Sequence, residues 1–155
     1  MSAKITKPIA IGCDHGALEL KEQLKKHLEE NNIAYNDLGT YTTESVHYPV
    51  YADKVCKEIT EGRSELGLLL CTTGVGMSMA ANKHRGIRAA LCADTRSARF
   101  TRMHNDANVL CMGAHIVGVG LACDILDSFI NASFEGGHHQ ARVDMLCELE
   151  KNELK

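Results

Sequence analysis

This 155-residue sequence lacks the features of several protein classes. No apolar run approaches the roughly 18 residues that span a membrane. Its first eight residues are too polar, and the apolar run after them too short, for a secretory signal. An excess of positive charge is also missing, since 17 Lys and Arg face 20 Asp and Glu. We therefore expect neither a membrane nor a nucleic acid as partner.

Closely paired cysteines are missing as well. The seven cysteines are widely spaced, odd in number and include no CxxC motif, which disfavours a disulfide framework and a zinc ribbon. The eight histidines form no HExxH or comparable ligand spacing, so the sequence predicts no metal site. Reduced, scattered cysteines are typical of a cytoplasmic protein.

The sequence does contain short apolar runs that alternate with helical patterns. Strands are predicted at 9–13, 33–39, 66–71, 87–92 and 109–112, and helices at 17–28, 48–62, 76–83, 95–104, 117–130 and 141–154. Strands that are apolar on both faces and separated by helices are typical of a parallel sheet covered on both sides. We expect one domain over residues 1–155, a three-layer α/β/α Rossmann-like sandwich with a five-stranded parallel sheet.

Ligands of such sheets bind beyond the carboxyl ends of the strands. The segments that follow the apolar runs are 14–16, 40–48, 71–76, 93–94 and 113–115. We expect every functional residue to lie on this side of the sheet or at a helix start.

The segment Cys71-Thr72-Thr73-Gly74-Val75-Gly76-Met77-Ser78 is the most informative. An apolar strand leads directly into a Gly/Thr-rich turn and then a helix. The backbone N–H groups of such a turn can hold an anion, favour a thiolate or stabilise an oxyanion in a substrate. The pattern leaves a simpler interpretation open, in which Cys71 is a core cysteine and the glycines only form the turn.

The same segment imitates a dinucleotide-binding fingerprint. Gly74 and Gly76 begin it, and Asp94 follows about 20 residues on. However, Met79 occupies the third glycine position, and the glycines follow the third strand rather than the first. A nucleotide-binding protein is therefore disfavoured.

Two further polar segments could carry chemistry. Asp14 and His15 follow the first strand and can bind sugar hydroxyls or a phosphate, although Asp14 also suits a helix cap. His104 lies in a polar segment, 104–108, at the end of a helix. It could be a general acid or base, or part of a solvated loop.

Six segments together resemble ribose-5-phosphate isomerase type B and the related isomerases of allose and galactose 6-phosphates. These segments are 12–16, 44–49, 71–78, 80–83, 86–90 and 104–108. The resemblance covers nearly the whole chain. It implies an aldose–ketose isomerase of the pentose phosphate pathway that works through a cis-enediolate without a metal or cofactor. It also implies a homodimer, alone or in a dimer of dimers, with active sites shared between subunits.

The resemblance also implies residue roles. Cys71 matches the base that moves a proton between C1 and C2, Thr73 the hydroxyl assisting it, and His104 the residue that opens the sugar ring. The N–H groups of 74–78 match an oxyanion cradle: Gly74, Val75, Gly76, Met77 and Ser78. The other matched contacts are Asp14 and Tyr48 with the sugar, Asn82 and Asn105 as positioning groups, and His15, His139 and Arg142 at the phosphate.

Four positions depart from the family pattern. His47 replaces an aspartate, Thr72 replaces a glycine, and His115 and His138 align with two arginines that clamp the phosphate. These changes leave three functions open. They are isomerisation of ribose 5-phosphate and ribulose 5-phosphate, isomerisation of a six-carbon sugar phosphate, and non-catalytic binding of a sugar phosphate.

Overall fold

The computed structural model describes residues 5–153. Residues 1–4 of the polar start, and the predicted helix end at 154, lie outside this range. The described chain contains a five-stranded, all-parallel sheet in the order β2-β1-β3-β5-β4. Its strands are β1 (Ile9–Cys13), β2 (Tyr35–Asp37), β3 (Gly67–Cys71), β4 (Ala89–Leu91) and β5 (Val109–Gly113). The predicted parallel sheet is therefore confirmed.

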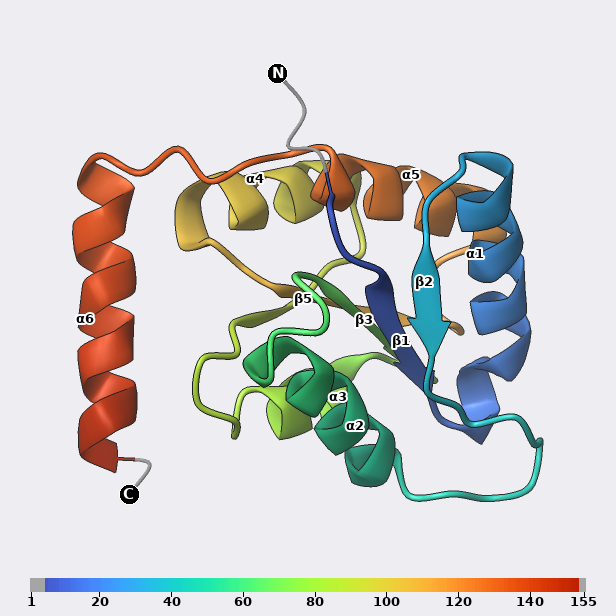
Figure 1. Ribbon diagram of the computed structural model, residues 1–155. Helices are drawn as coiled ribbons and strands as arrows, with labels where there is room; N and C mark the ends of the chain where they lie inside the picture. The colour runs from blue at the N-terminus through green and yellow to red at the C-terminus, as the bar shows by residue number, and fades with distance from the viewer. Residues whose placement is uncertain (1–4, 154–155) are drawn as a thin grey trace.

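Helices cover both faces of the sheet, as Figure 1 shows. One short 3-10 helix, η1 (His15–Ala17), precedes α1 (Leu18–Glu30), α2 (Tyr48–Thr60), α3 (Val75–Ala81), α4 (Thr95–Asn105), α5 (Val119–Ile130) and α6 (His138–Glu153). Residues of α1, α4 and α5 form the larger core on one face, and residues of α2 and α3 form the smaller core on the other. The predicted three-layer sandwich is confirmed. Among the described residues, no helix has the length and apolar character needed to cross a bilayer.

The edge strands differ most from their predicted bounds. The apolar residues at 33–35 and 38–39 predicted the second strand, yet β2 is Tyr35–Asp37 and includes the polar Asn36. Similarly, β4 covers only 89–91 of the predicted 87–92. Each edge strand pairs with one neighbour only, β2 with β1 and β4 with β5. The length of each edge strand is therefore set by its backbone hydrogen bonds to that one neighbour rather than by burial. The pattern of apolar residues does not show where these hydrogen bonds end.

Lys21 is a fully buried cation beside the carboxyl ends of β1 and β2. Its Nζ donates to Asp37 Oδ1 at 2.8 Å and to Thr40 O at 2.6 Å. Lys25 Nζ forms a second ion pair with Asp37, at 2.9 Å. Burial disfavours the Asp37 carboxylate, but the hydrogen bonds from both lysines outweigh it and lower its pKa. The group anchors the segment that leads from β2 to α2.

Replacing Lys21 with methionine is expected to lower the free energy of unfolding by about 3 kcal/mol. This is the lower end of the range for a broken buried ion pair, because Lys25 still neutralises Asp37. Urea unfolding measures the change. The control is Lys26→Met, whose side chain is 71% exposed, and its effect should stay within about 0.5 kcal/mol. Equal effects of the two variants would show that the buried pair contributes nothing.

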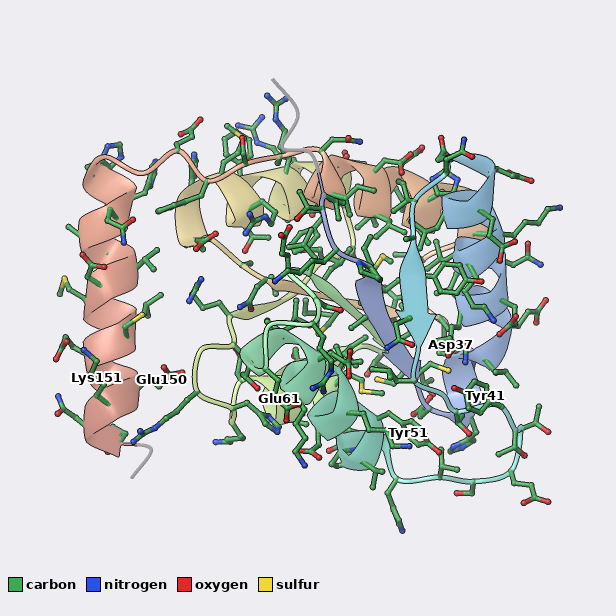
Figure 2. All side chains as sticks on the ribbon, viewed as in Figure 1. Asp37, Tyr41, Tyr51, Glu61, Glu150 and Lys151 are labelled. Atoms are coloured by element: carbon green, nitrogen blue, oxygen red, sulfur yellow. The ribbon has the colours of Figure 1, made fainter. Side chains whose placement is uncertain are left out.

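The helix α6 stands apart from both layers (Figure 1). Among its described residues only His139 and Val143 are buried, whereas Met145, Leu146 and Leu149 are exposed. Glu150 reaches the body by accepting a hydrogen bond from Gly86 N–H at 2.9 Å (Figure 2). A cavity of about 490 Å³ separates α6 from the body, and its lining includes Asn82 and Asn105. The helix therefore presents an apolar face that its own chain does not cover.

Candidate active site

Three strand ends meet at the carboxyl edge of the sheet. Cys13 pairs with Leu70, and Cys71 pairs with Gly113. Asp14 follows β1, and its N–H donates to Leu70 O at 3.1 Å. Asp14 and Cys71 therefore lie at the carboxyl ends of two adjacent strands. The chain from β1 continues to β2 on one side of this pair, and the chain from β3 continues to β4 on the other. Ligands bind at such switch points in open α/β sheets.

Cys71 ends β3 and is 5% exposed. Its Sγ accepts a hydrogen bond from Gly74 N–H at 3.0 Å. The turn requires glycine at position 74, because φ is +78° and a Cβ there would lie 2.8 Å from the Met112 carbonyl carbon. Val75 N–H donates to Thr73 Oγ1 at 3.4 Å. Gly74 N–H is thus the group that contacts the sulfur, in a position to stabilise negative charge there. Ser78 N–H, which was predicted as part of the cradle, instead donates to Gly74 O at 3.0 Å.

The other buried cysteines have different surroundings. Burial raises the pKa of Cys13 to about 11, that of Cys56 to about 12 and that of Cys92 to about 11, and it holds that of Cys111 well above its usual value. Cys13 and Cys56 donate their S–H to carbonyl oxygens, of Thr40 and Ala81. These thiols stay protonated and act as small core residues, whereas Cys71 Sγ is an acceptor.

Tyr48 and His15 border the Cys71 turn. The Tyr48 ring packs against Gly76, where a Cβ would lie 2.8 Å from Tyr48 Cζ. His15 Nδ1 accepts a hydrogen bond from Val46 N–H at 3.2 Å, so a neutral His15 carries its proton on Nε2. Asp14 Oδ1 accepts from Gly16 N–H at 2.9 Å, which confirms the predicted cap. The segment before α2 is thereby held over the strand ends.

The placement of His104 contradicts one prediction. We expected every functional residue on the carboxyl side of the sheet or at a helix start. His104 and Asn105 instead end α4, which leaves the carboxyl end of β4 and returns to the amino end of β5. They therefore lie toward the amino ends of the strands, at the opposite edge of the sheet from Cys71, which lies at the carboxyl ends. The reason is topological, because each helix between parallel strands runs antiparallel to them.

His104 belongs to a second polar cluster, made with the connection after α5 and the start of α6. His104 Nε2 and His139 Nε2 each lie 3.7 Å from Glu135 Oε2. The rings of His104 and His139 are stacked, with centroids 4.1 Å apart, and His138 lies 4.0 Å from His139. Partial burial, and then the positive charges of His138, His104 and Arg142, lower the pKa of His139. This cluster contains four of the predicted site residues.

Two further predicted residues lie at different ends of the strands: His115 at the carboxyl ends and Asn82 toward the amino ends. His115 follows β5, near the Cys71 turn, and its N–H donates to Thr72 O at 3.0 Å. Asn82 ends α3, and its amide already bonds the main chain: Nδ2 donates to Ser78 O and Ala89 O, and Oδ1 accepts from Ala89 N–H. Asn82 therefore joins α3 to β4, and only a lone pair of Oδ1 is left for a ligand.

Sequence reasoning missed Glu135. It interacts with both His104 and His139 although it lies in the connection between α5 and α6. The available signal was its position four residues before His139, across two glycines. That spacing brings the two side chains together only if a helix begins between these two positions.

The fold and the carboxyl-edge site define a class: a doubly wound α/β protein with a buried cysteine and a glycine turn at its topological switch point. The family model described as Ribose/Galactose Isomerase matches residues 9–146. The chain belongs to this family.

Individual relatives agree with the family assignment. The chain is 44% identical to Ribose-5-phosphate isomerase B of Escherichia coli K12 over 145 residues, which are 94% of this chain and 97% of that protein. The solved structure of the Clostridium thermocellum ribose-5-phosphate isomerase B has a TM-score of 0.92 and 43% identity, over 94% and 98% of the two chains. That of the Mycoplasma genitalium enzyme, with bound ribulose-5-phosphate, has a TM-score of 0.90 and 37% identity, over 96% and 99%.

Proposed function

We propose that this protein interconverts ribose 5-phosphate and ribulose 5-phosphate. The observation that carries the proposal is the hydrogen bond from Gly74 N–H to the buried Cys71 Sγ, within a turn of further N–H groups. The names of the E. coli and C. thermocellum relatives support the substrate, as does the ribulose 5-phosphate bound to the M. genitalium protein. We treat residues 1–155 as one sugar-phosphate isomerase domain of a cytoplasmic protein.

The chemistry is a proton shift with no net oxidation. The Cys71 thiolate takes the proton from C2 of the open-chain aldose, and the electron pair moves to the carbonyl oxygen on C1, giving an enediolate. The N–H groups of Gly76 and Met77 would stabilise this charge, because those of Gly74, Val75 and Ser78 already have acceptors. Cys71 returns the proton to C1 while the O2 hydroxyl proton passes to O1, a transfer that we assign to Thr73. Because C1 is reduced as C2 is oxidised, the step needs no external oxidant or reductant.

The complete site requires two subunits. Cys71 and His104 lie toward opposite edges of the sheet in one chain, so ring opening by His104 must serve another subunit's Cys71. The exposed Met145, Leu146 and Leu149 of α6 give an apolar surface for that contact. We therefore propose a homodimer, alone or in a dimer of dimers, in which the His104 cluster of one subunit completes the Cys71 turn of its partner.

The substrate contacts follow from this pairing. Asp14 and Tyr48 would contact the sugar beside Cys71, with His15 toward the phosphate. From the partner, Asn105 would position the sugar, and the phosphate would meet His138, His139 and Arg142. His115, on the Cys71 side, would meet the same phosphate.

A six-carbon sugar phosphate is the second candidate. The family description includes galactose as well as ribose. Thr72 also lies within the predicted site, with its Oγ1 2.5 Å from where a Cβ of Gly16 would be, so this side chain limits the space beside Asp14.

One assay tests both candidates. Purified protein is incubated with ribose 5-phosphate, allose 6-phosphate or galactose 6-phosphate, with and without a chelator, and the ketose is measured. Formation of ribulose 5-phosphate at the highest kcat/KM supports the proposal. Preference for a six-carbon substrate replaces it with the second candidate. Binding without turnover of any of the three would show a sugar-phosphate-binding protein.

Binding of a phosphorylated sugar-acid inhibitor at about pH 8 is expected to tighten when His115 and His138 are both replaced by arginine. Arginine stays charged at every working pH, so the two substitutions would add fixed positive charge beside Arg142 at the phosphate.

Calorimetry at about pH 8 compares inhibitor affinity in the wild type and in the double variant H115R and H138R. Equal affinities would remove both histidines from the phosphate site.

A further inference from the structure

Three side chains from separate segments converge near the start of α6. His104 ends α4, Glu135 lies in the connection after α5, and His139 is in the first turn of α6. One donor atom from each lies within 4.8 Å of the other two. Two imidazoles and a carboxylate are a donor set that holds Zn²⁺ in proteins.

The spacing of the donor atoms suits a metal ion. Each histidine Nε2 is 3.7 Å from Glu135 Oε2. Two atoms that bind one Zn²⁺ at roughly 2.0–2.2 Å with a tetrahedral angle lie about 3.3–3.6 Å from each other, which is close to these distances. The two rings are stacked and nearly parallel, at 9° with centroids 4.1 Å apart, so no nearby point lies in both ring planes in this arrangement. Binding of one ion by both rings therefore requires them to rotate about the Cβ–Cγ bond, which is a soft torsion.

The surroundings set the affinity. His139 is buried, and Glu135 is 47% exposed, which leaves a route for an ion. The positive charge of Arg142 opposes a cation, while Glu135 is the one carboxylate in the cluster. The binding should therefore be weaker than in closed structural zinc sites.

We propose that His104, Glu135 and His139 form a zinc site, and that zinc bound there inhibits the enzyme. The inhibition follows because the metal takes the lone pair of the imidazole assigned to ring opening; this part rests on the proposed function. Zinc here is an inhibitor rather than a cofactor, and its binding is independent of any activity.

Zinc binding is measured directly, by competition with a chromophoric chelator at pH 7.5. Wild-type protein should bind one Zn²⁺ per chain at this site. Glu135→Gln, which keeps the shape of the side chain, should weaken binding at least about tenfold, the loss that even an outer-shell partner can cause. His139→Gln is the second variant. The matched control is His84→Asn, since His84 Nε2 pairs with Asp53 at 3.1 Å elsewhere, and it should bind zinc as the wild type does.

Cobalt distinguishes this site from the free thiols. All of these variants keep the seven cysteines, so zinc held by sulfur would persist in every one. Co²⁺ bound to nitrogen and oxygen gives visible bands without the intense near-ultraviolet thiolate band. Equal zinc affinity in wild type, Glu135→Gln and His139→Gln, or a thiolate band with Co²⁺, would overturn the site.

Activity separates the two claims. Zinc should slow isomerisation of ring-closed substrate by wild type, chelator should restore it, and Glu135→Gln should need at least about tenfold more zinc. Normal binding without inhibition would keep the site but reject its inhibitory role. Absence of turnover in metal-free wild type would reject the proposed function and leave the binding result standing.

Discussion

Replacing Cys71 with alanine is expected to lower kcat for ribose 5-phosphate by about 10²–10⁴-fold or more, the range for a lost general base. The protein should remain folded, because the change removes one sulfur atom from a strand end. Steady-state kinetics and the melting temperature test both parts. The variant should also lose exchange of the substrate C2 proton with solvent deuterium.

The matched control is Cys92→Ala. Cys92 is also buried, 3% exposed, and burial raises the pKa of its thiol to about 11. It lies in the core on the α1, α4 and α5 face, so its loss should affect stability more than turnover. Near-normal turnover in the Cys71 variant would mean that another residue moves the proton.

Mixing two inactive variants is expected to restore activity. Cys71→Ala and His104→Ala each disable every site of their own homodimer. In a mixed dimer, one site keeps the Cys71 of one subunit and the His104 of the other, while the second site loses both. Random pairing makes half of the dimers mixed, so about a quarter of the wild-type sites should recover. The reason is that Cys71 and His104 lie toward opposite edges of the sheet in each chain.

Coexpression of the two variants, each with its own tag, allows purification of the mixed dimer and measurement of its turnover. The control is a dimer that carries both substitutions in one subunit and none in the other. One of its sites lacks Cys71 and the other lacks His104, so it should be inactive. Activity in this control with none in the mixed dimer would show that each site draws both residues from one chain.

Much of the fold follows from local pattern. The runs at 9–13 and 109–112 are apolar throughout, as a strand buried on both faces must be, and β1 and β5 are buried at every position. The turn at 71–76 was also readable, since glycine at position 74 reports a backbone that other residues rarely adopt. Asp14 was predicted as a cap and is one.

Other features escaped the pattern. Lys21 has the sequence signature of an exposed helical lysine, yet its Nζ is buried against Asp37 and Thr40 O. The sequence also predicted a helix at 141–154, but its pattern did not show that this helix, α6, stands away from the sheet (Figure 1). Both features depend on contacts with residues that are distant in the chain, and the local spacing of residue types does not reveal such contacts.

The sequence by itself determined the alternating β/α order, the parallel sheet and the glycine turn that follows Cys71. Each depends on neighbours along the chain: hydrophobic periodicity, the conformational freedom of glycine and the N–H groups of one turn. Only the tertiary structure decided that His104 joins Glu135 and His139, and that this cluster lies toward the opposite edge of the sheet from Cys71. The physical reason is that these contacts are made between segments whose positions are fixed by packing on a common sheet.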